Sequence, residues 1–191
     1  MSLTLPLKVD LTHIPLSDAQ FHQLCLNNPN LTIERDPQGA LIFMSPVGGE
    51  SGNTELELGI DLGIWNRRTK LGKVFSSSTL FKLPGGGDRS PDVAWVALSR
   101  WQSLTPEQRQ KFPPIAPDFV IELRSPTDGL SALQDKMQEY IASGVRLGWL
   151  INPQQQQVEI YRQGSKEVRS LPAELSGEAI LPGFTLTIEK F

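Results

Sequence analysis

The sequence predicts an α/β fold in which a central mixed β-sheet is flanked by helices. Short apolar runs typical of strands lie on both sides of one long helical pattern, which covers about residues 50–69. A strand, a helix and a second strand then follow one another over residues 117–151, the order in which a crossover joins two parallel strands. Hairpins elsewhere in the chain add antiparallel neighbours, so the sheet is expected to be mixed.

Length and composition limit the classes of protein that the chain can be. Its 191 residues fit one domain, or one domain with an appendage, and can bury a core without disulfides or a structural metal. A net charge of −3 argues against a protein that coats nucleic acid by bulk charge. It does not argue against an enzyme that engages phosphates through a bound metal.

Two further observations concern the compartment. The single cysteine, Cys25, excludes an internal disulfide and is typical of a reducing environment. No segment reaches the ~18 apolar residues that a membrane span requires, and the first residues lack a basic region followed by an apolar run. We therefore expect a cytoplasmic protein with no membrane partner.

The N-terminal residues are expected to form an appendage. Residues 1–15 contain two prolines and have no regular pattern, whereas Ser17 is a good cap for a short helix that ends at about Asn27. We therefore divide the chain into an N-terminal arm with a short helix, residues 1–29, and a single domain, residues 30–191. No linker divides the second part further.

The next elements are a hairpin and the long helix. The hairpin strands cover residues 31–34 and 40–44 and turn at residues 36–39. The helix of residues 50–69 ends before Gly72. Its apolar residues cover two of its sides, so we expect it to be largely buried; they are Leu56, Ile60 and Ile64 on one side and Leu58, Leu62 and Trp65 on the other.

The remaining chain alternates strands with helical segments. A Pro-containing helical insertion over residues 98–117 separates the two strands that carry the acidic residues discussed below, and a helix over about residues 130–143 follows the second of them. The expected strands cover residues 73–76, 79–83, 90–96, 117–123, 147–151, 158–162, 167–171, 178–181 and 185–188.

Two carboxylates interrupt strands that are otherwise apolar. Asp92 lies in the run Ser90–Val96, and Glu122 lies in the run Pro117–Leu123. An ionised carboxylate in such a place costs several kcal/mol unless a positive charge pairs with it. A divalent cation shared by both strands would resolve this cost. Alternatively, Asp92 is a turn residue, and Glu122 forms a structural ion pair with Arg124 or another base.

Two more charged residues are candidates for the same site. In the helix of residues 130–143, Lys136 lies at the margin of the apolar stripe, one turn before Tyr140, and can reach the end of the sheet where Glu122 lies. Taken alone, such a lysine is more often solvated. Glu50 lies at the start of the long helix, where the helix dipole favours a negative charge.

The order and spacing of these residues resemble a known family. Pro91-Asp92 followed by Glu122 in the next strand is the pattern of PD-(D/E)xK nucleases. The chain is also similar to the Uma-two family of bacterial restriction-endonuclease-like proteins over about residues 30–165. The matching stretches are residues 91–96 and 117–127, Lys136 before Tyr140, Gly144, and residues 149–153 and 158–161.

This resemblance implies a restriction-endonuclease-like core with a metal site. Asp92 and Glu122 would bind Mg²⁺ or Mn²⁺, Lys136 would polarise the attacking water, and Glu50 would be an auxiliary acid and metal ligand. The usual pattern has a lysine two residues after the glutamate, where this chain has Arg124. Arginine stays protonated and cannot act as a base, but it can hold a phosphate.

The predicted function is Mg²⁺-dependent endonuclease activity on the phosphodiester bonds of nucleic acid, with DNA as the expected substrate and a homodimer as the expected assembly. The alternative is a binding or assembly module that keeps the nuclease fold without turnover, dimerising through the insertion of residues 98–117. Glycoside hydrolysis by a carboxylate pair ranks last, because no aromatic platform for a sugar is evident.

Overall fold

A computed structural model describes residues 6–191 of the chain, so residues 1–5 of the predicted arm lie outside the described part. Its helices are α1 (Asp18–Asn27), α2 (Gly49–Thr69), α3 (Leu98–Ser103), α4 (Pro106–Gln110), α5 (Leu130–Ala142) and the 3₁₀ turn η1 (Pro153–Gln155). Its strands are β1 (Leu7–Val9), β2 (Ile33–Arg35), β3 (Leu41–Phe43), β4 (Gly72–Ser76), β5 (Phe81–Lys82), β6 (Asp88–Arg89), β7 (Val93–Ala97), β8 (Phe119–Leu123), β9 (Leu147–Asn152), β10 (Gln157–Arg162), β11 (Ser165–Ser170), β12 (Ala173–Ser176) and β13 (Thr185–Ile188).

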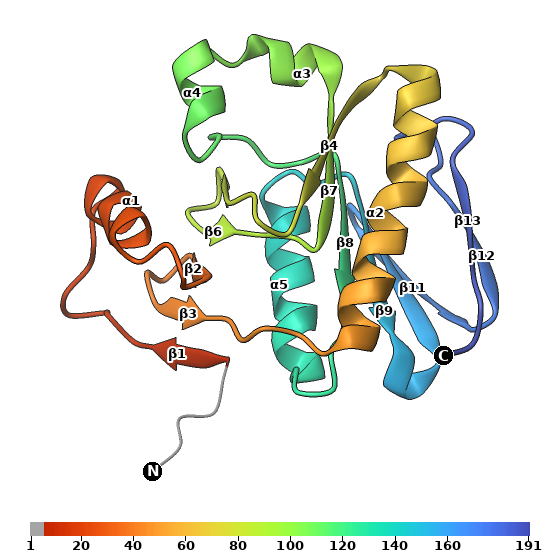
Figure 1. The fold of residues 1–191 in the computed structure, drawn as a ribbon, viewed down its shortest axis with the longest axis horizontal. Helices are drawn as coiled ribbons and strands as arrows, with labels where there is room; N and C mark the ends of the chain where they lie inside the picture. The colour runs from red at the N-terminus through yellow and green to blue at the C-terminus, as the bar shows by residue number, and fades with distance from the viewer. Residues whose placement is uncertain (1–5) are drawn as a thin grey trace.

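The central sheet confirms the predicted fold class. Its six strands lie in the order β11-β10-β9-β8-β7-β4. β8 and β9 are parallel and joined by α5, as the crossover pattern predicts, and the other neighbouring pairs are antiparallel. The sheet is therefore mixed, and β4 and β11 are its two edges (Figure 1).

Helices cover both faces of this sheet. On one face, α2 packs with the small β12–β13 sheet against the inward residues of β7 to β10, around Trp95, Phe119 and Trp149. On the other face, α5 packs through Met137 and Tyr140 against the opposite side of the same strands. Because side chains alternate along a strand, Glu122 lies on the α5 face together with Val120.

A second sheet, in the order β1-β3-β2-β6-β5, lies beside the first. It joins the N-terminal hairpin to the segment that leads into β7, and Phe21 of α1 packs onto it. β1 pairs with β3, so residues 7–9 of the predicted arm belong to this sheet. The boundary between residues 29 and 30 stays a prediction.

The prediction that α2 is buried on two sides was wrong. Leu58, Leu62 and Trp65 lie in the core, but the side formed by Leu56, Ile60 and Ile64 is exposed. The central sheet offers α2 one face, and no other described element covers the opposite side. None of the helices in residues 6–191 is long and apolar enough to cross a bilayer.

Candidate active site

Asp92 and Glu122 lie on neighbouring strands of the central sheet. Asp92 directly precedes β7, and its Oδ2 accepts a hydrogen bond of 2.7 Å from the backbone N–H of Leu123 in β8. Glu122 is the residue before Leu123, and the register pairs Val93 with Ile121. Both carboxylates therefore line one cavity of about 230 Å³.

Lys136 reaches the same cavity from α5. Its Nζ lies 2.9 Å from Glu122 Oε1 and 2.9 Å from Glu34 Oε1, and it donates to the carbonyl of Ser90 at 3.4 Å. One helical turn later, the hydroxyl of Tyr140 donates to Glu122 Oε1 at 2.8 Å. The helical period thus brings both side chains onto one carboxylate of β8.

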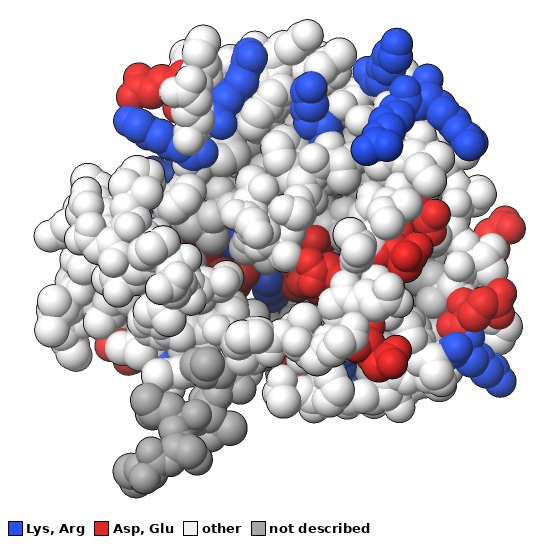
Figure 2. Space-filling model, viewed as in Figure 1, with Lys and Arg blue, Asp and Glu red and all other residues white. Residues whose placement is uncertain are grey.

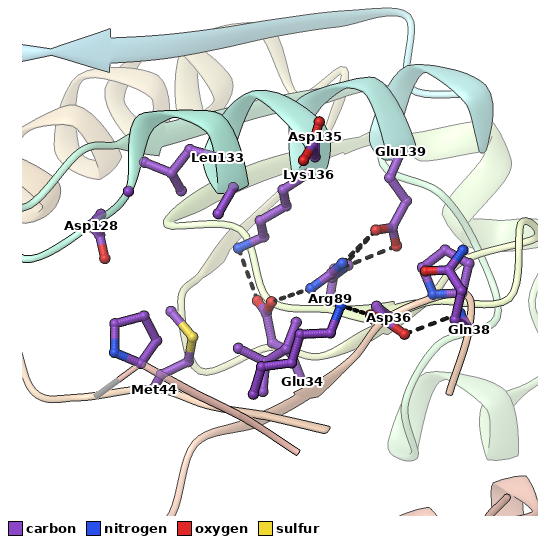
Figure 3. Close-up of a pocket in the computed structure, with 16 residues that line it drawn as sticks. Glu34, Asp36, Gln38, Met44, Arg89, Asp128, Leu133, Asp135, Lys136 and Glu139 are labelled. Atoms are coloured by element: carbon purple, nitrogen blue, oxygen red, sulfur yellow. Dashed lines mark hydrogen bonds and ion pairs between the residues drawn. The ribbon is translucent and has the colours of Figure 1, made fainter. Parts of the chain in front are cut away.

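Glu34 of β2 connects the two sheets. Besides Lys136, its carboxylate accepts a hydrogen bond of 2.9 Å from the backbone N–H of Ser90 and forms a 2.9 Å ion pair with Arg89. Arg89 in turn donates to Glu139 of α5 through Nε at 3.0 Å. Figure 3 shows this chain of ion pairs from α5 through Arg89 to Glu34. Ser90, held in this way, lies two residues before Asp92.

We call these charged residues the ion cluster; its members are Glu34, Arg89, Asp92, Glu122, Lys136 and Glu139. Four carboxylates face two cations, so the cluster carries a formal charge of −2 when every member is ionised. All but Asp92 and Glu139 are buried, and those two are partly buried. Two negative charges in excess inside a protein are costly without a counter-ion.

Burial and neighbouring charges shift the pKa values of the cluster in different directions. Burial raises the pKa of Asp92 well above its ordinary value, and the charge of Glu122 raises it further. Burial also raises the pKa of Glu122, against the charge of Lys136. Burial disfavours the charged form of Lys136, but the carboxylates of Glu122 and Glu34 outweigh it and raise its pKa, so the ammonium stays protonated.

Glu34 and Tyr140 complete this electrostatic picture. Burial opposes ionisation of Glu34, but the charges of Lys136 and Arg89 outweigh burial and lower its pKa. Burial and the charge of Glu122 raise the pKa of Tyr140, so its hydroxyl remains a donor. The excess negative charge therefore resides mainly at Asp92 and Glu122.

The donor atoms at this point fit a hard divalent cation. Among residues 6–191, Asp92 Oδ1 and Glu122 Oε2 accept no hydrogen bond, while the second oxygen of each carboxylate is held by protein groups. Mg²⁺ and Mn²⁺ prefer such oxygens, and Mg²⁺ usually keeps several waters beside one or two carboxylates. The described residues contain no group of three or more His, Cys, Asp or Glu side chains arranged to hold a metal, so water would complete the shell.

The cavity lined by Asp92 and Glu122 has many hydroxyl groups in its wall. Seven hydroxyl-bearing residues line it together with the acids: Thr32, Ser45, Ser51, Ser77, Ser78, Ser90 and Ser125. A second cavity of about 530 Å³ lies between α5 and the N-terminal hairpin, and Glu34 and Lys136 line it as well (Figure 3). Glu34 and Lys136 therefore lie in the wall that the two cavities share.

The structure does not bring Glu50 to the ion cluster. Its side chain is exposed in the first turn of α2, whereas Ser51 and Glu55 line the cavity. Residues four apart share one side of a helix, and Glu50 is turned by ~100° from Ser51. The auxiliary role of Glu50 stays a prediction, and Glu55 is the acid that α2 contributes to the cavity wall.

Arg124 also lies apart from Glu122. It donates to the carbonyl of Asp128 at 3.1 Å and to Asn152 Oδ1 at 3.3 Å, and no ion pair with Glu122 occurs in the described chain. Lys136 is the base that pairs with Glu122.

Four contributing residues were not recognised in the sequence as part of the site: Glu34, Glu55, Arg89 and Glu139. Glu34 carried the same signal as Glu122, an acid directly after an apolar strand residue, and Arg89 directly precedes the Ser90-Pro91-Asp92 segment. The other two carried none, since each is an ordinary helix glutamate. Tyr140, which packs in the core, also donates a hydrogen bond to Glu122.

Comparisons with known proteins identify the family of the chain and a similar fold. The sequence matches the family Uma2, described as "Putative restriction endonuclease", over residues 18–189. The fold is similar to the crystal structure of a "putative nuclease belonging to DUF820" from Anabaena variabilis ATCC 29413, with a TM-score of 0.74 and 21% sequence identity. The match covers 91% of this chain and 95% of that chain. A search of curated proteins gives no match.

Proposed function

The chain belongs to the Uma2 family of restriction-endonuclease-like proteins, and from this premise we propose that it is a metal-dependent endonuclease that hydrolyses phosphodiester bonds of DNA. One observation carries the proposal: Asp92 and Glu122, each with an oxygen that accepts no hydrogen bond from the described residues, meet Lys136 in one hydroxyl-lined cavity. The family and the fold support assignment to the nucleases, and the residues that line the cavity support hydrolysis with a bound metal ion.

Asp92 and Glu122 would hold Mg²⁺ or Mn²⁺ by Oδ1 and Oε2, the oxygens that accept no hydrogen bond from residues 6–191. A bound divalent cation supplies a more acidic water and offsets the charge that develops on the phosphate. The backbone N–H of Leu123 fixes the carboxylate of Asp92, and Tyr140 with Lys136 fixes that of Glu122. Neither acid therefore has to reorient when a cation arrives.

Lys136 would act by its charge. Against the effect of burial, the carboxylates of Glu122 and Glu34 raise the pKa of Lys136, which favours the protonated ammonium. It can donate hydrogen bonds to a phosphate oxygen or to the attacking water, and a preorganised donor of this kind lowers the barrier where charge develops. Glu34 would be a positioning residue, because it holds Lys136 and the Ser90 backbone that leads to Asp92.

Replacing Glu122 with glutamine tests the proposed function. The amide can still accept the hydrogen bond from Tyr140, so the fold should persist, but it is a poor ligand for a hard cation. We expect Mg²⁺-dependent cleavage of plasmid DNA to fall by about a hundredfold or more. The measurement is the rate of nicking and linearisation of supercoiled DNA with added Mg²⁺, and with a chelator as the metal-free control. Equal rates for the wild type and Glu122→Gln would contradict the assignment.

A comparison of Glu55→Gln with Glu50→Gln tests which acid of α2 serves the site. Because Glu55 lines the cavity and Glu50 is exposed, we expect Glu55→Gln to lower the cleavage rate about tenfold and Glu50→Gln to lower it less. The two variants change the same chemical group on the same helix. The reverse order would support the auxiliary role predicted for Glu50.

One observation favours a second candidate, a nuclease-fold binding module without turnover. Lys136 pairs with both Glu34 and Glu122 at 2.9 Å, as a lysine does in a structural ion cluster that binds no metal. Titration calorimetry with Mn²⁺ separates the two functions. An enzyme should show binding heat that Asp92→Asn and Glu122→Gln both remove, whereas a module without a metal site should show no such heat.

A further inference from the structure

An exposed apolar side of α2 borders an edge of the central sheet. We call it the α2 stripe; its residues Leu56, Ile60 and Ile64 are 60%, 41% and 42% exposed and lie one helical turn apart. A groove of about 580 Å³ runs between this stripe and β4, with Val74, Phe75 and Ser76 as its other wall. Within residues 6–191, β4 pairs with β7 alone, so its outer edge has no strand beside it. Continuous apolar surface of this kind is typical of an interface between proteins.

The two ends of this groove carry opposite charges. Glu55 lines one end and Arg67 the other, and neither forms an ion pair or a side-chain hydrogen bond within residues 6–191. Twelve residues separate them, which is ~18 Å along a helix. Figure 2 shows this face, with Lys and Arg gathered over the end of α2 and acidic side chains further down the helix. A surface with opposite charges at its ends is complementary to a copy of itself turned through 180°.

The residues at the middle of the groove suit close contact between two helices. Gly59 and Gly63 lie on either side of the midpoint between Glu55 and Arg67. A Cβ added at Gly63 would meet no atom within 4 Å, and one added at Gly59 would meet Val93 Cγ2 alone, at 3.9 Å. The fold of one chain therefore does not require either glycine, although each lowers the helix propensity of α2.

We propose that the protein forms a two-fold symmetric homodimer in which the α2 helices of two copies pack antiparallel. Gly59 of one copy meets Gly63 of the other near the axis and Glu55 meets Arg67, while Leu56, Ile60 and Ile64 of the two stripes pack beside these pairs. An interface related by a two-fold axis uses the same patch on both copies, as this pattern requires. Asp92 lines the same groove, so the interface adjoins the candidate active site.

This surface differs from the one predicted from the sequence, the insertion of residues 98–117. That insertion forms α3 and α4, and its Trp101 packs on Phe75 of the same chain with ring centroids 5.0 Å apart. The insertion thus uses its large aromatic side chain within the chain, whereas the α2 stripe remains uncovered.

Sedimentation velocity and light scattering of the full chain at micromolar concentrations test the dimer. The wild type should have twice the chain mass of 21.2 kDa. Ile60→Glu places a charge in the middle of the stripe and should halve the observed mass. Gly63→Leu should also give the monomer, and it should still fold, because a side chain there meets nothing within the chain. Val168→Glu is the matched control, since Val168 is 49% exposed on the opposite edge strand β11, and it should leave the dimer intact.

The charges give an independent check. Arg67→Glu should raise the dimer dissociation constant by at least about tenfold, and adding Glu55→Arg should restore it, because the pair is then reversed. A wild-type mass of 21.2 kDa, a dimer that survives both Ile60→Glu and Gly63→Leu, or dissociation by Val168→Glu would each overturn the proposal. These measurements do not depend on cleavage activity. A result against the dimer therefore does not contradict the proposed function, and a result against the proposed function does not contradict the dimer.

Discussion

Lys136→Met is expected to lower the free energy of unfolding by about 3–5 kcal/mol, since it removes one partner of buried ion pairs and leaves carboxylates without their counter-charge. Glu122 would keep only the hydroxyl of Tyr140, and Glu34 would keep Arg89 and the N–H of Ser90. The cleavage rate should fall by about a thousandfold, as expected for loss of a preorganised donor. Urea unfolding and DNA cleavage measure the two effects.

The control for this variant is Lys111→Met. Lys111 forms an exposed pair with Glu107 one helical turn away, and such pairs contribute little to stability. The deficit of Lys136→Met should also shrink as the pH falls, because Glu122 can then take up a proton. A variant as stable as the wild type at neutral pH would show that Lys136 does not neutralise the ion cluster.

Asp92→Asn is expected to have opposite effects on stability and activity. Cleavage should fall by about a thousandfold or more, because the variant loses a charged ligand for the cation. In the presence of a chelator, the same variant should be more stable than the wild type at pH 7, by about 1–3 kcal/mol. The amide oxygen can still accept the hydrogen bond from Leu123, and the buried negative charge is gone.

The pH dependence of this gain follows from the raised pKa of Asp92. A carboxyl whose pKa is raised by folding binds its proton more tightly in the folded than in the unfolded chain. Its contribution to stability is therefore present below the ordinary pKa of an aspartate and is lost as the pH rises through the folded value. The advantage of Asp92→Asn should accordingly vanish in acid and grow toward neutral pH. A gain independent of pH would contradict the explanation.

The core of the site could be predicted because it depends on local periodicity. Alternation along β8 and the helical period of α5 are enough to bring Glu122, Lys136 and Tyr140 toward one another, once a crossover joins β8 to β9. The position of Asp92 follows from the pairing of consecutive strands. These contacts join elements that follow one another along the chain, and a local sequence pattern can show them.

The other features of the site depend on contacts between elements far apart in the sequence, or on the rotation of a helix about its axis. A local sequence pattern shows neither. Glu34 reaches the site through the pairing of β2 with β6, which are far apart in the sequence and meet at Arg35 and Asp88. The choice between Glu50 and Glu55 depends on the rotation of α2 about its axis. The exposed α2 stripe looks in the sequence like a side buried in the core, because its apolar residues have the same helical spacing as those that face the sheet.

The ion cluster can form only when most of the chain has been synthesised and folded. Its members come from β2, from β6 with the turn that follows it, from β8 and from α5, so every fragment that ends before residue 139 lacks at least one of them. Local detachment of the second sheet would withdraw Glu34 and Arg89 together, because both lie on its strands, and Lys136 would keep Glu122 as its ion-pair partner. The proposed activity therefore depends on residues spread from β2 to α5, and a chain that ends before residue 139 cannot complete the ion cluster.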